Sequence, residues 1–125
     1  MTPTDSIRIL AVDDHAVFRE GIAALLATQP DMNLVAEAAN GREAIERFRQ
    51  HRPDVTLMDL QMPVMNGVDA MTAIRKEFPD ARIIIVTTYA GDVDGAMKLG
   101  ARAYVLKTEL HKDLLGTIRA VQAGK

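Results

Sequence analysis

Short apolar runs alternate along the chain with longer amphipathic stretches. The runs lie near residues 7 to 12, 33 to 38, 54 to 58, 82 to 86 and 102 to 106. Their length and their bounding polar residues favour β-strands. An amphipathic helical pattern follows each run, and the last one carries the stripe Leu110, Leu114, Ile118 and Val121. The pattern predicts five strand–helix units.

Strands that alternate with helices predict a parallel sheet covered on both faces. We expect an α/β, doubly wound, five-stranded parallel sheet of the flavodoxin-like (βα)5 type, with strand order 2-1-3-4-5. In this order the topological switch point, where the direction in which successive strands are added to the sheet changes, lies between the first and third strands. Folds of this class bind ligands at the carboxyl edge of the sheet, at the switch point.

Polar side chains stand directly after four of the five runs. Asp13 and Asp14 follow the first, Asp59 the third, Thr87 the fourth and Lys107 the fifth. Three carboxylates at one edge need a cation, and hard divalent ions such as Mg²⁺ prefer oxygen ligands. A hydroxyl and an ammonium are suitable donors to phosphoryl oxygens. The spacing therefore indicates phosphoryl chemistry.

Composition narrows the class of protein further. The 125 residues include no cysteine, with 48% hydrophobic and 26% charged residues, which predicts one globular domain over residues 1 to 125. We expect a cytoplasmic protein without a signal peptide or membrane span, because the apolar runs are short and no thiols are present. A net charge of −2 gives no basic field, so direct nucleic-acid binding by this domain is not expected.

These motifs together resemble the receiver domain of bacterial two-component response regulators. The resemblance covers almost the whole chain. It rests on Ile9-Leu10-Ala11-Val12-Asp13-Asp14, on Asp59-Leu60-Gln61-Met62-Pro63-Val64-Met65-Asn66-Gly67, on Thr87 and on Lys107. The order and spacing of these elements are specific in combination, although each alone is weak.

The resemblance implies a role for each acidic residue. Asp59 would be the phosphoacceptor for a sensor histidine kinase, and Asp13 and Asp14 would form the acidic metal site. Asp14 and Asp59 would contact Mg²⁺ directly, Gln61 would contribute its backbone carbonyl, and Asp13 would act mainly through water. Mn²⁺ would be able to substitute. The domain would not be an enzyme with a separate substrate, but would catalyse its own phosphorylation and dephosphorylation.

The resemblance also implies a conformational switch. Thr87 and Lys107 would hold the phosphoryl oxygens, and Thr87 would move toward the phosphate. The aromatic ring of Tyr104 would then turn into the vacated space and alter the surface around it. Family members dimerise through the first and fifth helices, or through the face formed by the fourth helix, fifth strand and fifth helix, so a homodimer is a further hypothesis.

Segments 100 to 107 and 118 to 125 look most like the NarL/FixJ (LuxR-type) branch of the family. Members of this branch continue into a helix-turn-helix DNA-binding domain and regulate transcription. The resemblance implies either an isolated receiver domain of a longer regulator, with its DNA-binding domain absent from this chain, or a natural single-domain protein.

Several positions leave alternatives open. Lys107 is followed by Thr108 where many receivers have proline, so a cis bond is not assumed. We expect His15 to be a solvent-exposed residue in the first turn of a helix, because imidazole is a poor Mg²⁺ ligand, although a transition metal could recruit it. Gln61 and Tyr89 either flank the pocket and limit water access, or are exposed loop residues.

Two rival functions remain at the level of sequence. A dehalogenase-type phosphatase also uses an aspartyl phosphate, but it places a second acid two residues after its nucleophile, where this chain has His15 after Asp13. A degenerate receiver would act only as a protein-binding module. The five polar residues at the strand ends argue against the second rival.

Overall fold

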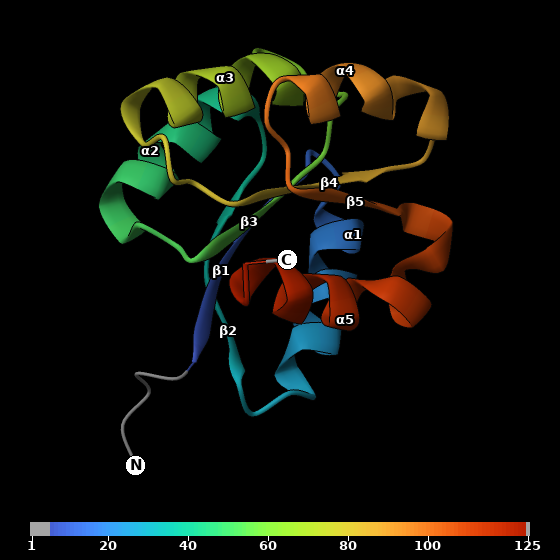
Figure 1. The fold of residues 1–125 in the computed structure, drawn as a ribbon. Helices are drawn as coiled ribbons and strands as arrows, with labels where there is room; N and C mark the ends of the chain where they lie inside the picture. Colours follow the sequence, from blue (N-terminus) through green and yellow to red (C-terminus); the bar gives the residue numbers. More distant parts are fainter. Residues whose placement is uncertain (1–5, 125) are drawn as a thin grey trace.

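The computed structural model describes residues 6–124, which form a single parallel sheet with helices on both faces (Figure 1). The strands are β1 (Ile7–Val12), β2 (Met32–Ala38), β3 (Val55–Met58), β4 (Ile83–Thr87) and β5 (Ala103–Leu106). The helices are α1 (Ala16–Ala27), α2 (Gly41–His51), α3 (Gly67–Glu77), α4 (Val93–Lys98) and α5 (Leu110–Gln122). The 3₁₀ turns η2 (Ala90–Asp92) and η3 (Lys107–Glu109) precede α4 and α5.

The strand order is β2-β1-β3-β4-β5, which confirms the predicted doubly wound topology. All pairs are parallel. β3 and β4 are buried along their whole length, as expected for parallel strands covered on both faces. Each predicted strand is present, and its bounds differ from the prediction by at most one residue at either end.

Alternation along the strands divides the interior into two cores. On one face, Ile9 and Ala11 of β1 pack with residues of α1 and α5. On the other face, Leu10 and Val12 pack with residues of α2, α3 and α4. Figure 1 shows the same division, with α1 and α5 on one side of the sheet and the remaining helices on the other. The sheet therefore separates the two hydrophobic cores.

The loop between β3 and α3 contains a tight turn at Val64. The backbone N–H of Met65 donates to the carbonyl of Pro63 at 2.7 Å, and Val64 between them has φ of 69°. This is a γ-turn of the strained kind, unusual for a β-branched residue. The loop ends where the side chain of Asn66 accepts a hydrogen bond from the N–H of Asp69 and caps α3.

There is no cis peptide bond among residues 6–124, so the Lys107–Thr108 bond is trans. Within the same range, every helix is too short or too polar to cross a membrane.

Candidate functional site

The register of the sheet brings the strand-end residues together. Val12 of β1 lies beside Met58 of β3, and the N–H of Asp59 continues this ladder to the carbonyl of Val12 at 3.0 Å. Asp13 and Asp59 therefore leave neighbouring strands at the same level. Across the sheet, Thr87 of β4 pairs with Leu106 of β5, which places it next to Lys107.

Lys107 holds the two buried carboxylates together. Its Nζ lies 2.6 Å from Oδ2 of Asp13 and 3.5 Å from Oδ2 of Asp59. The side chains of Asp13 and Lys107 are 2% and 12% exposed, so these ion pairs are shielded from water. The same ammonium lies 4.4 Å from the centre of the Phe18 ring, a cation–π contact from α1. Phe18 of α1 therefore packs against the ammonium group of Lys107.

The surroundings of Asp59 disfavour its charged form. Burial raises the pKa of Asp59 above its ordinary value, and the nearby Asp13 carboxylate raises it further. Lys107 and the backbone N–H of Gln61 oppose that rise by stabilising the carboxylate. The net direction is upward, so Asp59 lacks enough positive charge around it in the protein alone.

Thr87 and Asp59 line a cavity of about 300 Å³ at this edge. Gln61, Tyr89 and Lys107 are also at its wall. Gln61 and Tyr89 are both exposed and both line the cavity, so they flank the pocket; their control of water access stays a prediction. The buried Thr87 hydroxyl accepts a long hydrogen bond of 3.4 Å from the N–H of Tyr89.

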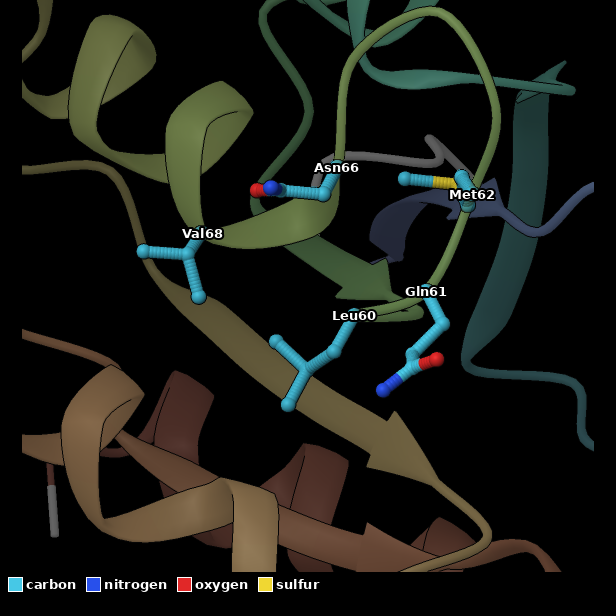
Figure 2. A pocket seen from close by; sticks show the side chains of 5 residues that line it. All are labelled: Leu60, Gln61, Met62, Asn66 and Val68. Carbon is cyan, nitrogen blue, oxygen red and sulfur yellow. The ribbon is translucent and has the colours of Figure 1, made fainter.

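A second hollow of about 410 Å³ adjoins this cavity through Gln61. Figure 2 shows Leu60 and Gln61 leaving the end of β3, and Asn66 and Val68 at the start of α3, around this hollow. Its lining is mixed, with no charged side chain among the five residues. Of these two hollows, the neighbouring cavity alone is lined by charged side chains, those of Asp59 and Lys107.

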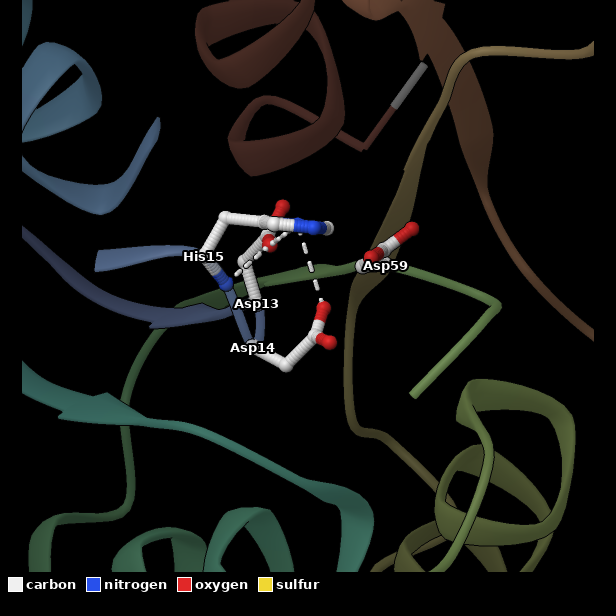
Figure 3. Close-up of side chains that lie close together, drawn as sticks. All are labelled: Asp13, Asp14, His15 and Asp59. Atoms are coloured by element: carbon white, nitrogen blue, oxygen red, sulfur yellow. Dashed lines mark hydrogen bonds and ion pairs between the residues drawn. The ribbon is translucent and has the colours of Figure 1, made fainter. Parts of the chain in front are cut away.

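Three carboxylates and one imidazole converge beside Lys107. Asp13, Asp14, His15 and Asp59 each offer one potential ligand atom, and these four atoms lie within 4.8 Å of one another (Figure 3). Oδ1 of Asp14 is buried and accepts no hydrogen bond within residues 6–124. An excess of carboxylate over ammonium, with a buried oxygen that lacks a hydrogen bond, fits a divalent cation.

His15 is closer to this centre than the sequence predicted. It is solvent-exposed as expected, but it occupies the N-cap position of α1 and not the first helical turn. Its Nδ1 lies 3.0 Å from Oδ1 of Asp13 and 3.2 Å from Oδ1 of Asp14. Asp13 also accepts a hydrogen bond of 2.8 Å from the backbone N–H of His15.

Tyr104 lies away from the cavity, with 47% of its surface exposed. It pairs in register with Ile85, two residues before Thr87. Side chains two apart on a strand point to the same face, so Thr87 and Tyr104 share the face covered by α4. The structure thus brings six predicted site residues, Gln61 among them, to one edge and leaves Tyr104 on an adjoining surface.

Both a protein-family model and individual relatives match this chain over most of its length. The family model described as "Response regulator receiver domain" matches residues 9–119. The response regulator protein VraR of Staphylococcus aureus is 39% identical over 122 residues, which cover 96% of this chain and 58% of VraR. The chain therefore spans little more than half the length of that relative.

Solved structures with the same fold include two regulators of the LuxR family. One, from Aurantimonas sp. SI85-9A1, superposes with a TM-score of 0.91 at 37% identity and covers 96% of this chain and 87% of its own. The other, a DNA-binding response regulator from Staphylococcus aureus, gives a TM-score of 0.86 at 29% identity, with 93% and 98% covered.

Proposed function

This chain belongs to the response regulator receiver domains, and from that premise we propose that Asp59 accepts a phosphoryl group from a sensor histidine kinase. The observation that carries the proposal is the placement of Asp59. Its carboxylate is buried at the carboxyl edge of β3, faces the charged group of Lys107 at 3.5 Å and opens onto the 300 Å³ cavity. A nucleophile, a cation and room for a phosphoryl group occur together there.

The proposed transfer forms one bond and breaks one. An oxygen of Asp59 attacks phosphorus, the N–P bond of the kinase phosphohistidine breaks, and the histidine nitrogen keeps the electron pair. Both reactants are anionic, so positioning and charge compensation supply most of the rate enhancement. Lys107 compensates part of this charge, and its contact with Phe18 holds it in place.

A divalent cation would supply the remaining positive charge. The acidic centre is consistent with a metal site, and we assign it to Mg²⁺, with Mn²⁺ able to substitute. Asp13, Asp14, Asp59 and the backbone carbonyl of Gln61 would hold the ion, Asp13 mainly through water. The ion would supply positive charge to the phosphoryl oxygens.

Thr87 and Tyr104 form the proposed switch. Phosphorylation adds about −1.5 to −2 charges and three acceptor oxygens. The Thr87 hydroxyl, now weakly engaged at 3.4 Å, donates to one of these oxygens while Lys107 binds another. The movement of Thr87 frees space on the face it shares with Tyr104, which turns inward from its exposed position. The phosphate shifts the equilibrium by these differential contacts.

The acyl phosphate is then removed by water, so the signal is transient. Gln61 and Tyr89 line the cavity where that water enters. Water attacks phosphorus, the bond to the Asp59 oxygen breaks and inorganic phosphate leaves; Lys107 would neutralise charge on the phosphoryl oxygens in this step, and a bound ion would supply further positive charge. The domain accordingly catalyses its own phosphorylation and dephosphorylation.

The output belongs to a longer protein. VraR extends well beyond the matched region, and a LuxR-family relative is described as DNA-binding. We propose that residues 1–125 form the receiver of a cytoplasmic transcription regulator whose helix-turn-helix domain, outside this chain, binds DNA. Homodimerisation through α1 and α5, or through α4, β5 and α5, would couple the switch to that domain. Light scattering before and after phosphorylation tests it, and a monomer in both states contradicts it.

Intact-protein mass after incubation with a small phosphodonor and Mg²⁺ tests the acceptor. We expect a gain of one phosphoryl group that disappears in Asp59→Asn and in EDTA. The matched control is Asp80→Asn, at an exposed position in the loop before β4, which should gain the group normally. No gain with a competent kinase also present would favour a constitutive binding module.

A further inference from the structure

Arg19 of α1 contacts the backbone of the acidic centre and is not among the described residues that line the 300 Å³ cavity. Its guanidinium donates through Nη1 to the main-chain carbonyl of Asp13 and through Nε to Oε1 of Glu37 at 3.0 Å. The Arg19 side chain is only 18% exposed, whereas that of Glu37 in β2 is 45% exposed. Because a guanidinium presents its N–H donors in one rigid plane, two acceptors orient it. Arg19 is therefore held between the end of β1 and β2.

This contact restrains the peptide unit that joins the two acidic residues after β1. The N–H of Asp13 donates to the carbonyl of Ala38 in β2 at 3.0 Å, and the carbonyl of Asp13 accepts the bond from Arg19. Both main-chain polar groups of Asp13 are thus paired. The Asp13 carbonyl lies in the same planar peptide as the N–H of Asp14, so a bond to that oxygen restricts rotation of the whole plane. The direction in which Asp14 leaves the backbone depends on this plane.

The two carboxylates differ in how their own contacts hold them. Oδ2 of Asp13 lies 2.6 Å from Nζ of Lys107, so a buried ion pair fixes that side chain. Oδ1 of Asp14 accepts no hydrogen bond in the described part of the chain, although Asp14 supplies one of the four potential ligand atoms of the acidic centre. The orientation of Asp14 therefore relies on its backbone, which is the part that Arg19 restrains.

We propose that Arg19 is a positioning residue for the acidic centre, acting through the Asp13–Asp14 peptide with Glu37 as its anchor. The inference rests on the proposed function, because it gives Arg19 a role in preparing the same site. Arg19 does not touch the reacting atoms, and its effect is on the direction of the carboxylates. Removal of outer partners of this kind typically lowers metal affinity by about 10- to 100-fold.

The sign of the effect separates positioning from simple electrostatics. Arg19 carries a permanent positive charge beside the backbone of Asp13. A charge at that place repels a divalent cation, so electrostatics alone predicts that Mg²⁺ binds more tightly when Arg19 is removed. Positioning predicts weaker binding, because Asp14 would then have to be ordered when the ion binds, at a cost in conformational entropy. A loss of Mg²⁺ affinity on removal of a positive charge is the specific expectation.

Calorimetric titration with Mg²⁺ tests the proposal in wild type, Arg19→Ala, Glu37→Gln and Arg49→Ala. We expect Arg19→Ala to weaken Mg²⁺ binding by about 10- to 100-fold. Glu37→Gln should weaken it less, because the bond to Asp13 remains. Free guanidinium ion at a non-denaturing concentration should restore part of the affinity of Arg19→Ala, whereas urea at the same concentration should not. Arg49, which pairs with Glu77 at 2.8 Å on the surface, is the matched control and its variant should bind as wild type does.

Arg19→Lys provides a second variant that keeps the charge and loses the planar fork. It should also weaken Mg²⁺ binding, and it decides the test if circular dichroism shows that Arg19→Ala is unfolded. In metal-free protein, the carbonyl ¹³C NMR signal of Asp13 should shift in both Arg19 variants and stay unchanged in Arg49→Ala. In phosphorylation assays, the Mg²⁺ concentration that gives half the maximal rate should rise, while the rate at saturating Mg²⁺ returns toward that of wild type.

Unchanged or tighter Mg²⁺ binding in a folded Arg19 variant would overturn the proposal, and so would an equal loss in Arg49→Ala or the absence of Mg²⁺ binding by wild type. The two proposals fail separately. A chain that is phosphorylated on Asp59 with a Mg²⁺ affinity independent of Arg19 refutes only the positioning role. A chain in which Arg19→Ala weakens Mg²⁺ binding, but which is never phosphorylated, refutes only the acceptor function.

Discussion

Asp59 is placed where its own charge is unfavourable. Because its pKa in the folded protein lies above the ordinary value near 3.8, the folded state binds a proton more readily than the unfolded chain does. The corresponding stabilisation is complete below that ordinary value and is lost as the pH rises through the folded pKa. At neutral pH without metal, the ionised Asp59 therefore destabilises the fold.

Asp59→Asn should consequently increase the free energy of unfolding in EDTA at pH 7. The gain should shrink as the pH falls toward 4, because wild-type Asp59 becomes protonated and loses its penalty. Urea denaturation across this pH range measures the difference. Asp80→Asn, at an exposed position, should show no comparable gain at neutral pH, and a destabilised Asp59→Asn would contradict the assigned electrostatics.

Thr56 buries a hydroxyl group that is not hydrogen-bonded within the described residues. It is fully buried in β3, and its Oγ1 has no hydrogen-bond partner in the described part of the chain. Thr56→Val keeps the shape and removes the unpaired hydroxyl, so it should stabilise the fold by about 1 kcal/mol. Thermal unfolding measures this gain, while phosphorylation should be unchanged. A loss of stability would show that the hydroxyl makes a favourable interaction.

At the scale of elements, α3 begins very close to the backbone of the acceptor. A Cβ on Gly67 would lie 2.1 Å from the carbonyl oxygen of Asp59, an approach that only glycine permits. Gly67 also donates its N–H to the Leu60 carbonyl at 2.9 Å. The start of α3 therefore fixes the position of the residue that carries the phosphate.

Gly67→Ala should destabilise the protein by about 1 to 3 kcal/mol, the usual cost of overpacking. It should also slow phosphorylation, because relief of the clash displaces Asp59. Gly116→Ala in α5 is the matched control, since its Cβ would meet no atom within 4 Å. That change should stabilise the helix by about 0.5 to 1 kcal/mol. Equal effects at both positions, measured by denaturation, would refute the close-approach explanation.

The elements themselves were readable from the sequence. Runs such as Ile83 to Val86 are apolar and β-branched, and such a run favours a central parallel strand that is buried on both faces. The γ-turn at Val64 was not predictable in the same way, because valine disfavours positive φ. The hydrogen bond from Met65 N–H to the Pro63 carbonyl accompanies this conformation, and no local sequence signal indicates it.

For the whole molecule, the topology determined which side chains meet. Asp13, Asp59, Thr87 and Lys107 were predictable as one site because parallel strands end at one edge. Phe18 and His15 were not assigned to it, since their contacts depend on how α1 packs against the sheet. Phe18 appeared in the sequence only as an apolar residue of a helix, and no local signal revealed its contact with Lys107.

Cation binding should stabilise the entire fold. An ion that binds only the folded state at 100 times its dissociation constant contributes about 2.7 kcal/mol. Mg²⁺ should therefore raise the unfolding temperature of wild type and reduce the stability advantage of Asp59→Asn, which lacks one carboxylate ligand. Calorimetric scans with and without Mg²⁺ measure both effects. An equal Mg²⁺ shift in the two proteins would place the ion elsewhere.

The site draws on residues from 13 to 107, and the last of them follows β5. During synthesis, a nascent chain carries Asp59 long before it carries the lysine that faces it. Until residue 107 has left the ribosome and β5 has paired with β4, the acceptor lacks its counter-charge and the edge that positions it. The proposed kinase would therefore act only on completely synthesised and folded domains. A truncated chain that ends before β5 would not be phosphorylated, even though it contains Asp59.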